Sequence, residues 1–387
     1  MPAALKRAAL SLAALSVAAL LTACGSTDSF EEPAPLPEIS ASVWLETAWD
    51  RSVGDGHDEQ LLFLQPALVE GTLYAVSADG ELQAVNPDNG ELQWERELPE
   101  RILAGVGADQ SRLFLGSRDG KLLALSRTDG ASDWSASLPS EVVAPPQSNG
   151  DVVVAHTIDG KVLGFDAASG ERRWQYDGQI PVLSFRGNAT PRVGADLTLV
   201  AFANGQVVAL DSATGEPAWQ YRVGEPVGRT ELERLVDVDG TPLVRDGVVY
   251  VTGYQGKVAA LDLTSGQELW SRESSSLESP ELAYGNVFVS GYDGVIRAFS
   301  LNSRQELWAQ SQLEWRRVTG LLAVDGVLLT GDFEGYIHIL SQLDGSLLGQ
   351  REVDDEGLRV PMLRYEDMAI VYSNSGELVA YRIQKQD

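Results

Sequence analysis

The side chains that most often carry nucleophilic or metal chemistry are scarce in this chain, which has one cysteine and three histidines in 387 residues. The histidines, His57, His156 and His338, lie far apart, so they form none of the closely spaced pairs typical of zinc sites. No Ser-His-Asp or Cys-His arrangement is recognisable either. No linear motif therefore indicates a catalytic or metal site, and Cys24 is the one residue whose chemistry needs an explanation.

The segment before Cys24 has the layout of a secretory signal. Lys6 and Arg7 precede an apolar run of 14 residues from Ala8 to Leu21, and small residues follow. A helix needs about 20 apolar residues to cross a membrane, so this run is too short, and no other segment approaches that length. We therefore expect residues 1–23 to be a signal peptide that is removed on export.

The register of Cys24 points to lipid attachment. Leu21 three positions before it and Gly25 after it resemble the lipobox of bacterial lipoproteins. In that family the cysteine sulfur receives a diacylglycerol, the signal is cut before the cysteine, and the new amino terminus is acylated. The resemblance implies lipidation at Cys24, and Gly25 in place of Asp resembles the sorting pattern for the periplasmic face of the outer membrane. The alternative is a thiol that is discarded with the signal.

The charge and the residues after Cys24 limit the partners. The net charge of −27 repels nucleic acid and anionic lipid head groups, so we expect no nucleic acid partner and no basic membrane-binding surface. Residues 26–40, STDSFEEPAPLPEIS, are rich in Ser, Glu and Pro and have no apolar period. Residues 24–40 are therefore predicted to be a lipidated amino terminus and flexible tether, of which residues 26–40 at ~3.3 Å per residue reach roughly 50 Å.

From residue 41 onward the chain repeats. Each copy alternates apolar and polar residues between Asp-Gly, Asn-Gly or Ser-Gly turns, which predicts four short strands at a period of about 40 residues. Seven copies end 14 residues after a hairpin glycine, at Trp94, Trp134, Trp174, Trp219, Trp270, Trp308 and Gly349. An eighth copy starts at SNSGELVAYRI but lacks its last strand. The stretch SVWLETAWDRS, with Trp49 in the tryptophan position, can pair with residues 377–383 and close the ring. The prediction is an all-β, eight-bladed β-propeller over residues 41–387.

Two copies carry a further resemblance. Ala260-x-Asp262-x-x-Ser265-Gly266 before Trp270, and the matching residues before Trp219, resemble the tryptophan-docking repeat of quinoprotein dehydrogenases. We expect each tryptophan to pack between blades and each Asp-x-x-Ser/Thr-Gly to form a turn with glycine at positive φ. Dehydrogenases of that family carry a vicinal disulfide and a calcium site with a catalytic aspartate, whereas this chain has one cysteine. A lipid-anchored quinoprotein-type enzyme remains the alternative function, and a surface adhesin is a third.

The length variation lies in the connections from an outer strand to the next inner strand. The connections at residues 174–191 and 219–242 are long and flank one blade, so they should be neighbours on one face. The first carries Leu183, Phe185 and Arg186, which are residue types that anchor protein interfaces. In the second, Glu231 to Asp239 has leucines at helical spacing, which predicts a short helix. The structural alternative is a clasp in which the apolar pair tucks inward and Arg186 pairs with Asp237 or Asp239.

Taken together, the lipobox, the acidic tether, the eight blades, LSFRG and ELERLVDVDGTP resemble the scaffold lipoproteins of the outer-membrane β-barrel assembly (Bam) machinery. That family is non-enzymatic, uses no cofactor, and binds the periplasmic (POTRA) domains of the barrel-forming subunit BamA. The resemblance implies a monomer within the complex that assists unfolded outer-membrane proteins. Carried over to this sequence, the partner-binding positions are Leu183, Phe185, Arg186, Asp237 and Asp239. Phe185 departs from the Leu that family members carry there.

Overall fold

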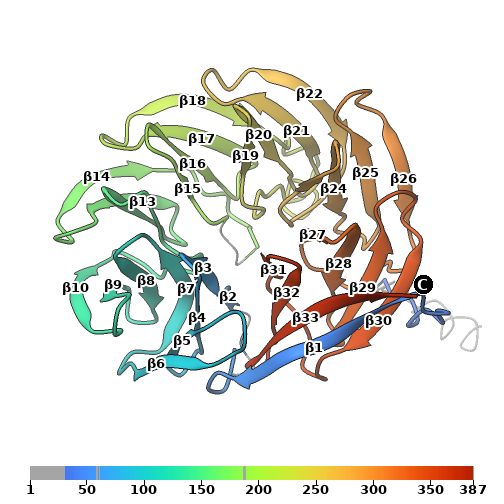
Figure 1. Cartoon of the computed structure of the whole chain (residues 1–387). Helices are drawn as coiled ribbons and strands as arrows, with labels where there is room; N and C mark the ends of the chain where they lie inside the picture. Colours follow the sequence, from blue (N-terminus) through green and yellow to red (C-terminus); the bar gives the residue numbers. More distant parts are fainter. Residues whose placement is uncertain (1–30, 58–59, 61, 186–188, 387) are drawn as a thin grey trace, which may run out of the picture. The chain divides into compact units, whose positions relative to one another are not determined.

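Short strands between glycine-containing turns form eight mainly antiparallel sheets around a central axis (Figure 1). The computed structural model describes residues 31–57, 60, 62–185 and 189–386, and the strands belong to the compact unit Ala34–Asp387. The predicted signal peptide, residues 1–23, and Cys24 lie outside the described residues. Across the part of the chain that is described, no helix has the length and apolar character needed to span a membrane.

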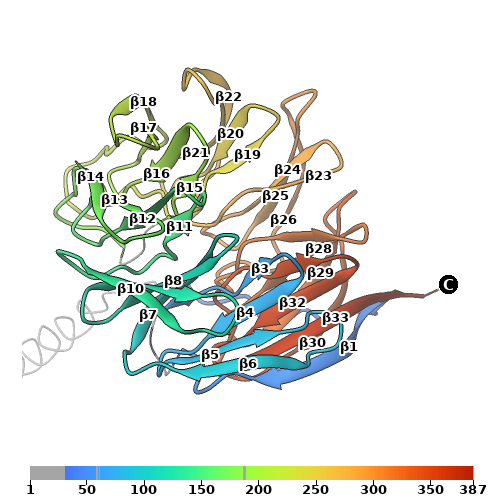
Figure 2. The ribbon, with the colours of Figure 1, turned by 60° about the vertical axis from the view of Figure 1, so that its left-hand side comes forward.

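The sheets are the blades of a propeller, and they follow one another in sequence around the ring, as the side view also shows (Figure 2). Blades 1 to 4 consist of β3 (Ala67–Val69), β4 (Thr72–Val76), β5 (Glu81–Val85) and β6 (Leu92–Glu97); β7 (Ile102–Ala108), β8 (Arg112–Ser117), β9 (Lys121–Ser126) and β10 (Ser132–Ser137); β11 (Gln147–Ser148), β12 (Val152–His156), β13 (Lys161–Asp166) and β14 (Arg172–Asp177); and β15 (Arg192–Val193), β16 (Leu197–Ala201), β17 (Gln206–Asp211) and β18 (Pro217–Arg222). Blades 5 to 8 consist of β19 (Leu243–Arg245), β20 (Val248–Val251), β21 (Lys257–Asp262) and β22 (Glu268–Glu273); β23 (Glu281–Ala283), β24 (Asn286–Ser290), β25 (Ile296–Ser300) and β26 (Glu306–Gln310); β27 (Leu322–Val324), β28 (Val327–Gly331), β29 (Tyr336–Ser341) and β30 (Leu347–Glu352); and β31 (Leu363–Tyr365), β32 (Met368–Tyr372), β33 (Glu377–Lys385) and β1 (Val43–Ser52).

The predicted ring closure is confirmed. The first strand, β1, pairs antiparallel with the last, β33, and Trp49 lies opposite Ala380 in that pair. The first and last strands of the chain thus share one sheet, in which β1 is the outer strand of blade 8 and covers the edge of β33.

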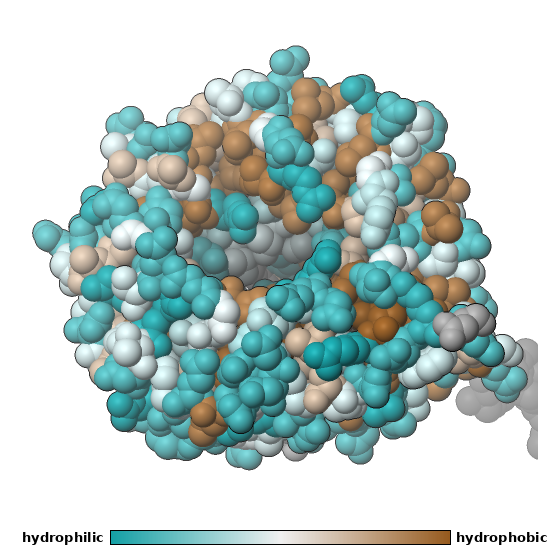
Figure 3. Space-filling model, viewed as in Figure 1, coloured by the Kyte–Doolittle hydropathy of each residue, from teal (hydrophilic) through white to brown (hydrophobic). Residues whose placement is uncertain are grey.

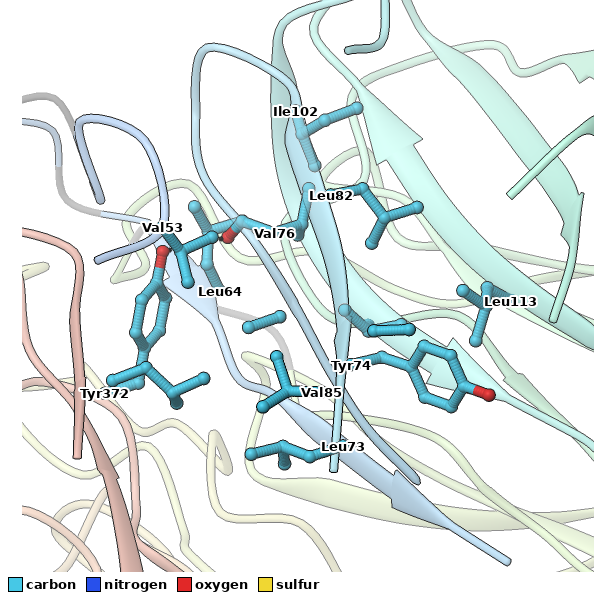
Figure 4. Close-up of a cluster of buried hydrophobic side chains, with 14 of the residues drawn as sticks. Val53, Leu64, Leu73, Tyr74, Val76, Leu82, Val85, Ile102, Leu113 and Tyr372 are labelled. Carbon is cyan, nitrogen blue, oxygen red and sulfur yellow. Dashed lines mark hydrogen bonds between the residues drawn. The ribbon is translucent and has the colours of Figure 1, made fainter. Parts of the chain in front are cut away.

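The hydrophobic core lies between adjacent blades. The middle strands are buried on both faces, as in β4 and β5, whereas the outer strand β6 is largely exposed. One cluster joins blades 8, 1 and 2 through fully buried side chains that include Val53, Leu73, Ile102 and Leu113 (Figure 4). Within it the Tyr372 hydroxyl donates to the Val76 carbonyl oxygen at 3.1 Å, so the only polar atom of that ring is satisfied. Burial of the apolar faces between sheets is therefore what holds the ring together.

The tryptophans dock each blade onto the next. The Trp174 ring lies opposite Gly164 of its own sheet, and its indole N–H donates to the Ser212 carbonyl oxygen of blade 4 at 3.0 Å. The same ring covers Gly215, which has φ of +72°. Equivalent indole hydrogen bonds to the following blade are made by Trp49, Trp94, Trp134, Trp219 and Trp308. The predicted packing between blades and the predicted positive-φ glycine are both confirmed.

Gly349, which replaces the tryptophan in blade 7, is explained by the start of β1. Gly349 lies opposite Ile339, where other blades have Ala or Gly opposite Trp. A Cβ at position 349 would collide with the carbonyl oxygen of Val43, and Ser42 donates its N–H to Leu348 at 2.9 Å. The incoming amino-terminal strand therefore occupies the space that a tryptophan ring would fill.

Blade 2 differs from the predicted four-stranded pattern by one strand. β2 (Phe63–Leu64) pairs in parallel with the inner strand β7. The Val106 N–H extends this pairing by donating to the Gln65 carbonyl oxygen at 2.7 Å. Five other blades have proline at the position of Val106, and proline has no N–H to donate. The missing proline therefore permits the fifth strand.

Residues 34–40, which the sequence assigns to the tether, lie against the propeller unit, and we call them the strap. The Ala34 N–H donates to the Glu314 carbonyl oxygen at 2.9 Å, and Arg316 Nη1 donates to the Ala34 carbonyl oxygen at 3.0 Å. Arg316 is 2% exposed and is fixed from the other side by Asp332, which also contacts His338 Nε2 at 2.8 Å. A buried charged network thus holds the strap in place.

Candidate functional site

The long connections and the hairpin turns between the second and third strands of each blade lie on one face, which we call the loop face. Backbone hydrogen bonds join the two sets, for example from Gly178 to Gly160 and from Val223 to Gly205. Isolated bridges between Gly224 and Gly256 and between Asp237 and Tyr254 add to this packing. The loops are therefore held close to the rigid blades, as binding loops on a scaffold usually are.

The first long connection presents apolar side chains to solvent. Val182 is 92% exposed, Leu183 is 42% exposed, and Ile180 is also exposed. Phe185, two residues after Leu183, is half-buried, and its ring meets Tyr254 edge to face at 5.0 Å between centroids. The pair predicted as anchors is thus split between an outward leucine and an inward phenylalanine. Arg186 lies outside the described residues.

The prediction of a short helix in the second long connection is wrong. Residues 231–234 form a single turn, with one helical hydrogen bond from Arg234 to Thr230. Glu233 accepts from the Thr230 N–H at 3.2 Å, while Thr230 Oγ1 accepts from the Glu233 N–H at 3.1 Å, which is a capping box. Only Leu235 of the two leucines is buried, and Leu232 is 69% exposed. Because one apolar contact does not stabilise a longer helix, the chain leaves the helical path after one turn.

Asp237 ties the two long connections together. It is 1% exposed, and its Oδ2 accepts from the Phe185 N–H at 3.2 Å. Its Oδ1 accepts from the Val238 N–H at 2.8 Å, and its backbone oxygen accepts from the Tyr254 N–H at 2.8 Å. Burial, and then the neighbouring Asp239, raises the pKa of the Asp237 carboxyl. Asp237 therefore joins the two long connections structurally, as a clasp would, by accepting from the backbone N–H of Phe185.

Asp239 faces the centre of the ring instead. It lines a cavity of about 270 Å³ together with Phe185, Glu278 and Arg359, and among the described residues no hydrogen-bond partner is found for its Oδ1. Burial raises the pKa of both Asp239 and Glu278, the latter to about 7. A second central cavity of about 570 Å³ is lined by the inner strands, and the space-filling view is hollowed at the centre of the ring (Figure 3).

The histidines are placed apart, in three separate cores. His57 is buried edge to face against Tyr372, and His156 is buried against Phe202. Burial lowers the pKa of each of these two to about 4. Within the described residues, no group of three or more His, Cys, Asp or Glu side chains is placed to hold a metal ion.

Sequence reasoning missed a row of aromatic rings that begins at Phe185. Tyr254 and Tyr292 meet at 4.6 Å between centroids, and Tyr292 meets Trp315 at 6.2 Å. The two tyrosines occupy the same position in the hairpins GYQG and GYDG of blades 5 and 6, where other copies carry no tyrosine. That shared departure from the repeat was the available signal. We call Phe185, Tyr254, Tyr292 and Trp315 the aromatic row.

Comparison with known proteins identifies close relatives. Residues 78–291 match the family model described as outer membrane protein assembly factor BamB. A protein of Marinobacter adhaerens with that name is 59% identical over 368 residues, which cover 95% of this chain and 94% of that protein. The crystal structure of BamB from Moraxella catarrhalis is 30% identical with a TM-score of 0.80, and it covers 88% of this chain and 100% of that one.

A europium-containing methanol dehydrogenase is also similar in structure. Its TM-score is 0.68 over 87% of this chain and 93% of that one, but only 13% of the residues are identical. At that level of identity the likeness shows the propeller fold alone.

Proposed function

Because the chain belongs to the BamB family of outer membrane protein assembly factors, we propose that its loop face docks the periplasmic domains of BamA. The chain is a non-enzymatic component of the Bam complex, so the quinoprotein-type enzyme is set aside. Its proposed task is to hold BamA and to assist the folding and insertion of unfolded outer-membrane proteins.

The single observation that carries the docking proposal is the apolar surface of the first long connection. Val182 and Leu183 are exposed on a loop in which the N–H of Phe185, two residues after Leu183, donates to Asp237 at 3.2 Å. An apolar anchor on a loop that is already ordered loses little conformational entropy when it binds. Arg186 follows Phe185 in the sequence and is proposed as the charged member of the site. Asp237 acts by positioning the loop, and Asp239 is proposed to complete the site.

Attachment to the periplasmic face of the outer membrane is proposed to occur through lipid on Cys24. The lipobox residues Leu21 and Gly25 support this proposal. Mass spectrometry of the mature protein tests it, because acylation adds a defined mass at the amino terminus. An unmodified Cys24 in the purified membrane fraction would contradict the anchor.

The docking proposal is tested by measuring the affinity of the purified protein for the BamA periplasmic domains. We expect Leu183→Asp, which places a charge in the proposed apolar contact, to weaken binding about tenfold or more. Arg186→Ala is expected to weaken binding as well. Leu343→Asp is the matched control, because Leu343 is 90% exposed on a turn between the third and fourth strands of blade 7, away from the loop face.

Unchanged affinity for Leu183→Asp, with the propeller folded by circular dichroism, would refute this assignment of the site. An equal loss for Leu343→Asp would also refute it, since the effect would then be a general response to charge. Asp237→Asn adds a positioning test. It is expected to speed amide exchange at Phe185 as it lowers affinity, because Asn has one acceptor oxygen for the Phe185 and Val238 N–H groups, whereas Asp237 accepts from them with its two oxygens.

A further inference from the structure

The aromatic row crosses three blades on the loop face. Phe185 comes from the connection between blades 3 and 4, and Tyr254 comes from the β20–β21 hairpin of blade 5. Tyr292 comes from the β24–β25 hairpin of blade 6, and Trp315 comes from the connection to blade 7. The successive rings meet edge to face, at 5.0, 4.6 and 6.2 Å between centroids. Such contacts are favourable geometries for aromatic pairs, so the row is an ordered surface rather than a set of independent side chains.

Backbone hydrogen bonds fix the position of the row. The Tyr254 N–H donates to Asp237 at 2.8 Å, and the Tyr292 N–H donates to Ser275 at 2.9 Å. The Trp315 N–H donates to the Asp293 carbonyl oxygen at 2.9 Å. Three of the rings are therefore attached to segments that are themselves held by neighbouring loops, and a partner would find them already in place.

The row keeps polar atoms and ring edges available. Tyr292 is 42% exposed, and the other three rings are half-buried. The indole N–H of Trp315 has no acceptor among the described residues, whereas Trp174 and its docking counterparts donate theirs to a carbonyl oxygen. Blade-docking hydrogen bonds thus account for the indole N–H groups of six other tryptophans, and the Trp315 N–H takes part in none of them.

Strained backbone accompanies the row. Gln255, Trp315 and Arg317 have φ of +47°, +60° and +50°. Residues other than glycine rarely adopt this region, because the side chain is strained there. Most of the other non-glycine residues with positive φ precede a glycine in a tight turn, as Glu70 does. No such turn accounts for Trp315 or Arg317, so the strained backbone presents these side chains on the loop face.

We propose that the aromatic row, with the exposed Arg317 beside it, is a second part of the surface that docks the BamA periplasmic domain. This inference rests on the proposed function, because the occupant is argued from continuity: the row starts at Phe185 and Asp237, inside the proposed site. Tyrosine, tryptophan and arginine are the residues that most often dominate binding energy. A folded domain seated at Leu183 would extend over blades 5 and 6 onto these side chains.

The test is the affinity of the full protein for the purified BamA periplasmic domains. Tyr292→Ala and Arg317→Glu are expected to weaken binding by about tenfold, since both side chains are exposed and neither supports the core. Tyr284→Ala is the matched control, because Tyr284 is 78% exposed in the turn between the first two strands of blade 6. Thermal unfolding of each variant confirms that the propeller is intact.

The outcomes separate this inference from the proposed function. Loss of affinity for Tyr292→Ala but not for Tyr284→Ala supports the row. Unchanged affinity for Tyr292→Ala and Arg317→Glu, with a loss for Leu183→Asp, overturns the row and leaves the proposed function standing. A photocrosslinker at position 292 adds a second readout in cells: capture of BamA supports the row, and exclusive capture of unfolded outer-membrane proteins overturns it.

Discussion

The carbonyl oxygen of Val43 fills the space that a Cβ on Gly349 would need, at the position where the other blades carry a tryptophan side chain. Blade 7 is therefore joined to its neighbour by the amino-terminal strand instead of by tryptophan docking. Gly349 is buried in β30 and adopts no left-handed conformation, so it is required for space and not for backbone freedom.

Gly349→Ala is expected to lower the thermal unfolding midpoint, because the new methyl group would push β1 away from β30. Overpacking of this kind typically costs about 1–3 kcal/mol. Ser135→Ala, in the exposed outer strand β10, is the control and should change stability by no more than about 0.5 kcal/mol. If both variants unfold at the wild-type temperature, the close approach of Val43 has no energetic consequence.

Tryptophan docking is tested by comparing two left-handed glycines. Gly215 has φ of +72° and would place a Cβ against the Trp174 ring, whereas Gly71 has φ of +74° with open space around it. Alanine at either position costs about 1–2 kcal/mol for the left-handed conformation. We expect Gly215→Ala to cost about 1–3 kcal/mol more, from the collision with the ring. Equal losses in urea unfolding would show that the ring moves aside freely.

The fold was predictable from the sequence because its determinants are local and repeated. Each tryptophan lies a fixed distance after a hairpin glycine, and the same register recurs around the ring, so the blade count and the closing role of Trp49 could be inferred. The extra strand β2 was not inferred. It depends on the parallel pairing of Phe63 and Leu64 with β7, which the Val106 N–H extends by donating to Gln65, and no periodic pattern encodes such a contact.

The site was less predictable because its contacts join distant loops. The leucine spacing around Leu232 and Leu235 resembles a helix, yet the packing surface for a second turn is absent, and only the capping box forms. The aromatic row brings together side chains from separate connections, and only the tyrosine shared by two hairpins marked it in the sequence. Loop positions of this kind are set by tertiary packing, which a single sequence does not show.

The strap is tested at Ala34. Ala34→Pro removes the N–H that donates to the Glu314 carbonyl oxygen, so the amide hydrogens of Leu36, Glu38, Ile39 and Ser40 should exchange several-fold faster. Glu32→Pro is the control, because Glu32 is exposed and its N–H donates no hydrogen bond within the described structure. Wild-type exchange rates in Ala34→Pro would mean that Arg316 holds the strap without this bond.

Glu281, on the inner strand β23 of blade 6, leads us to expect that the stability of the protein depends on pH. Burial raises the pKa of Glu281 to about 7, against the opposing effects of the Ala323 N–H, Arg245 and Arg364. The folded state then binds a proton that the unfolded state releases near pH 4.5, so the free energy of unfolding should fall as pH rises from about 4.5 to about 7. Glu281→Gln keeps the shape of the neutral acid and should flatten this decline. It should match the wild type at pH 5 and exceed it at pH 8 in urea unfolding.

The exposed Glu97 provides the control for that experiment. Glu97→Gln, at the end of the outer strand β6, should leave the pH profile unchanged. A Glu281→Gln profile parallel to that of the wild type would show that Glu281 is ionised in the folded protein, for example through a closer approach of Arg245.

Because β1 pairs with β33, the ring can close only after the ribosome has added the last strand. Roughly 325 residues separate the two strands, and at about 5–20 residues per second a ribosome needs roughly 16–65 s to add them. During that interval β1 has no partner, and the first blades can form only an open arc with apolar ends. The ring therefore stays open until the last strand of the chain has been made.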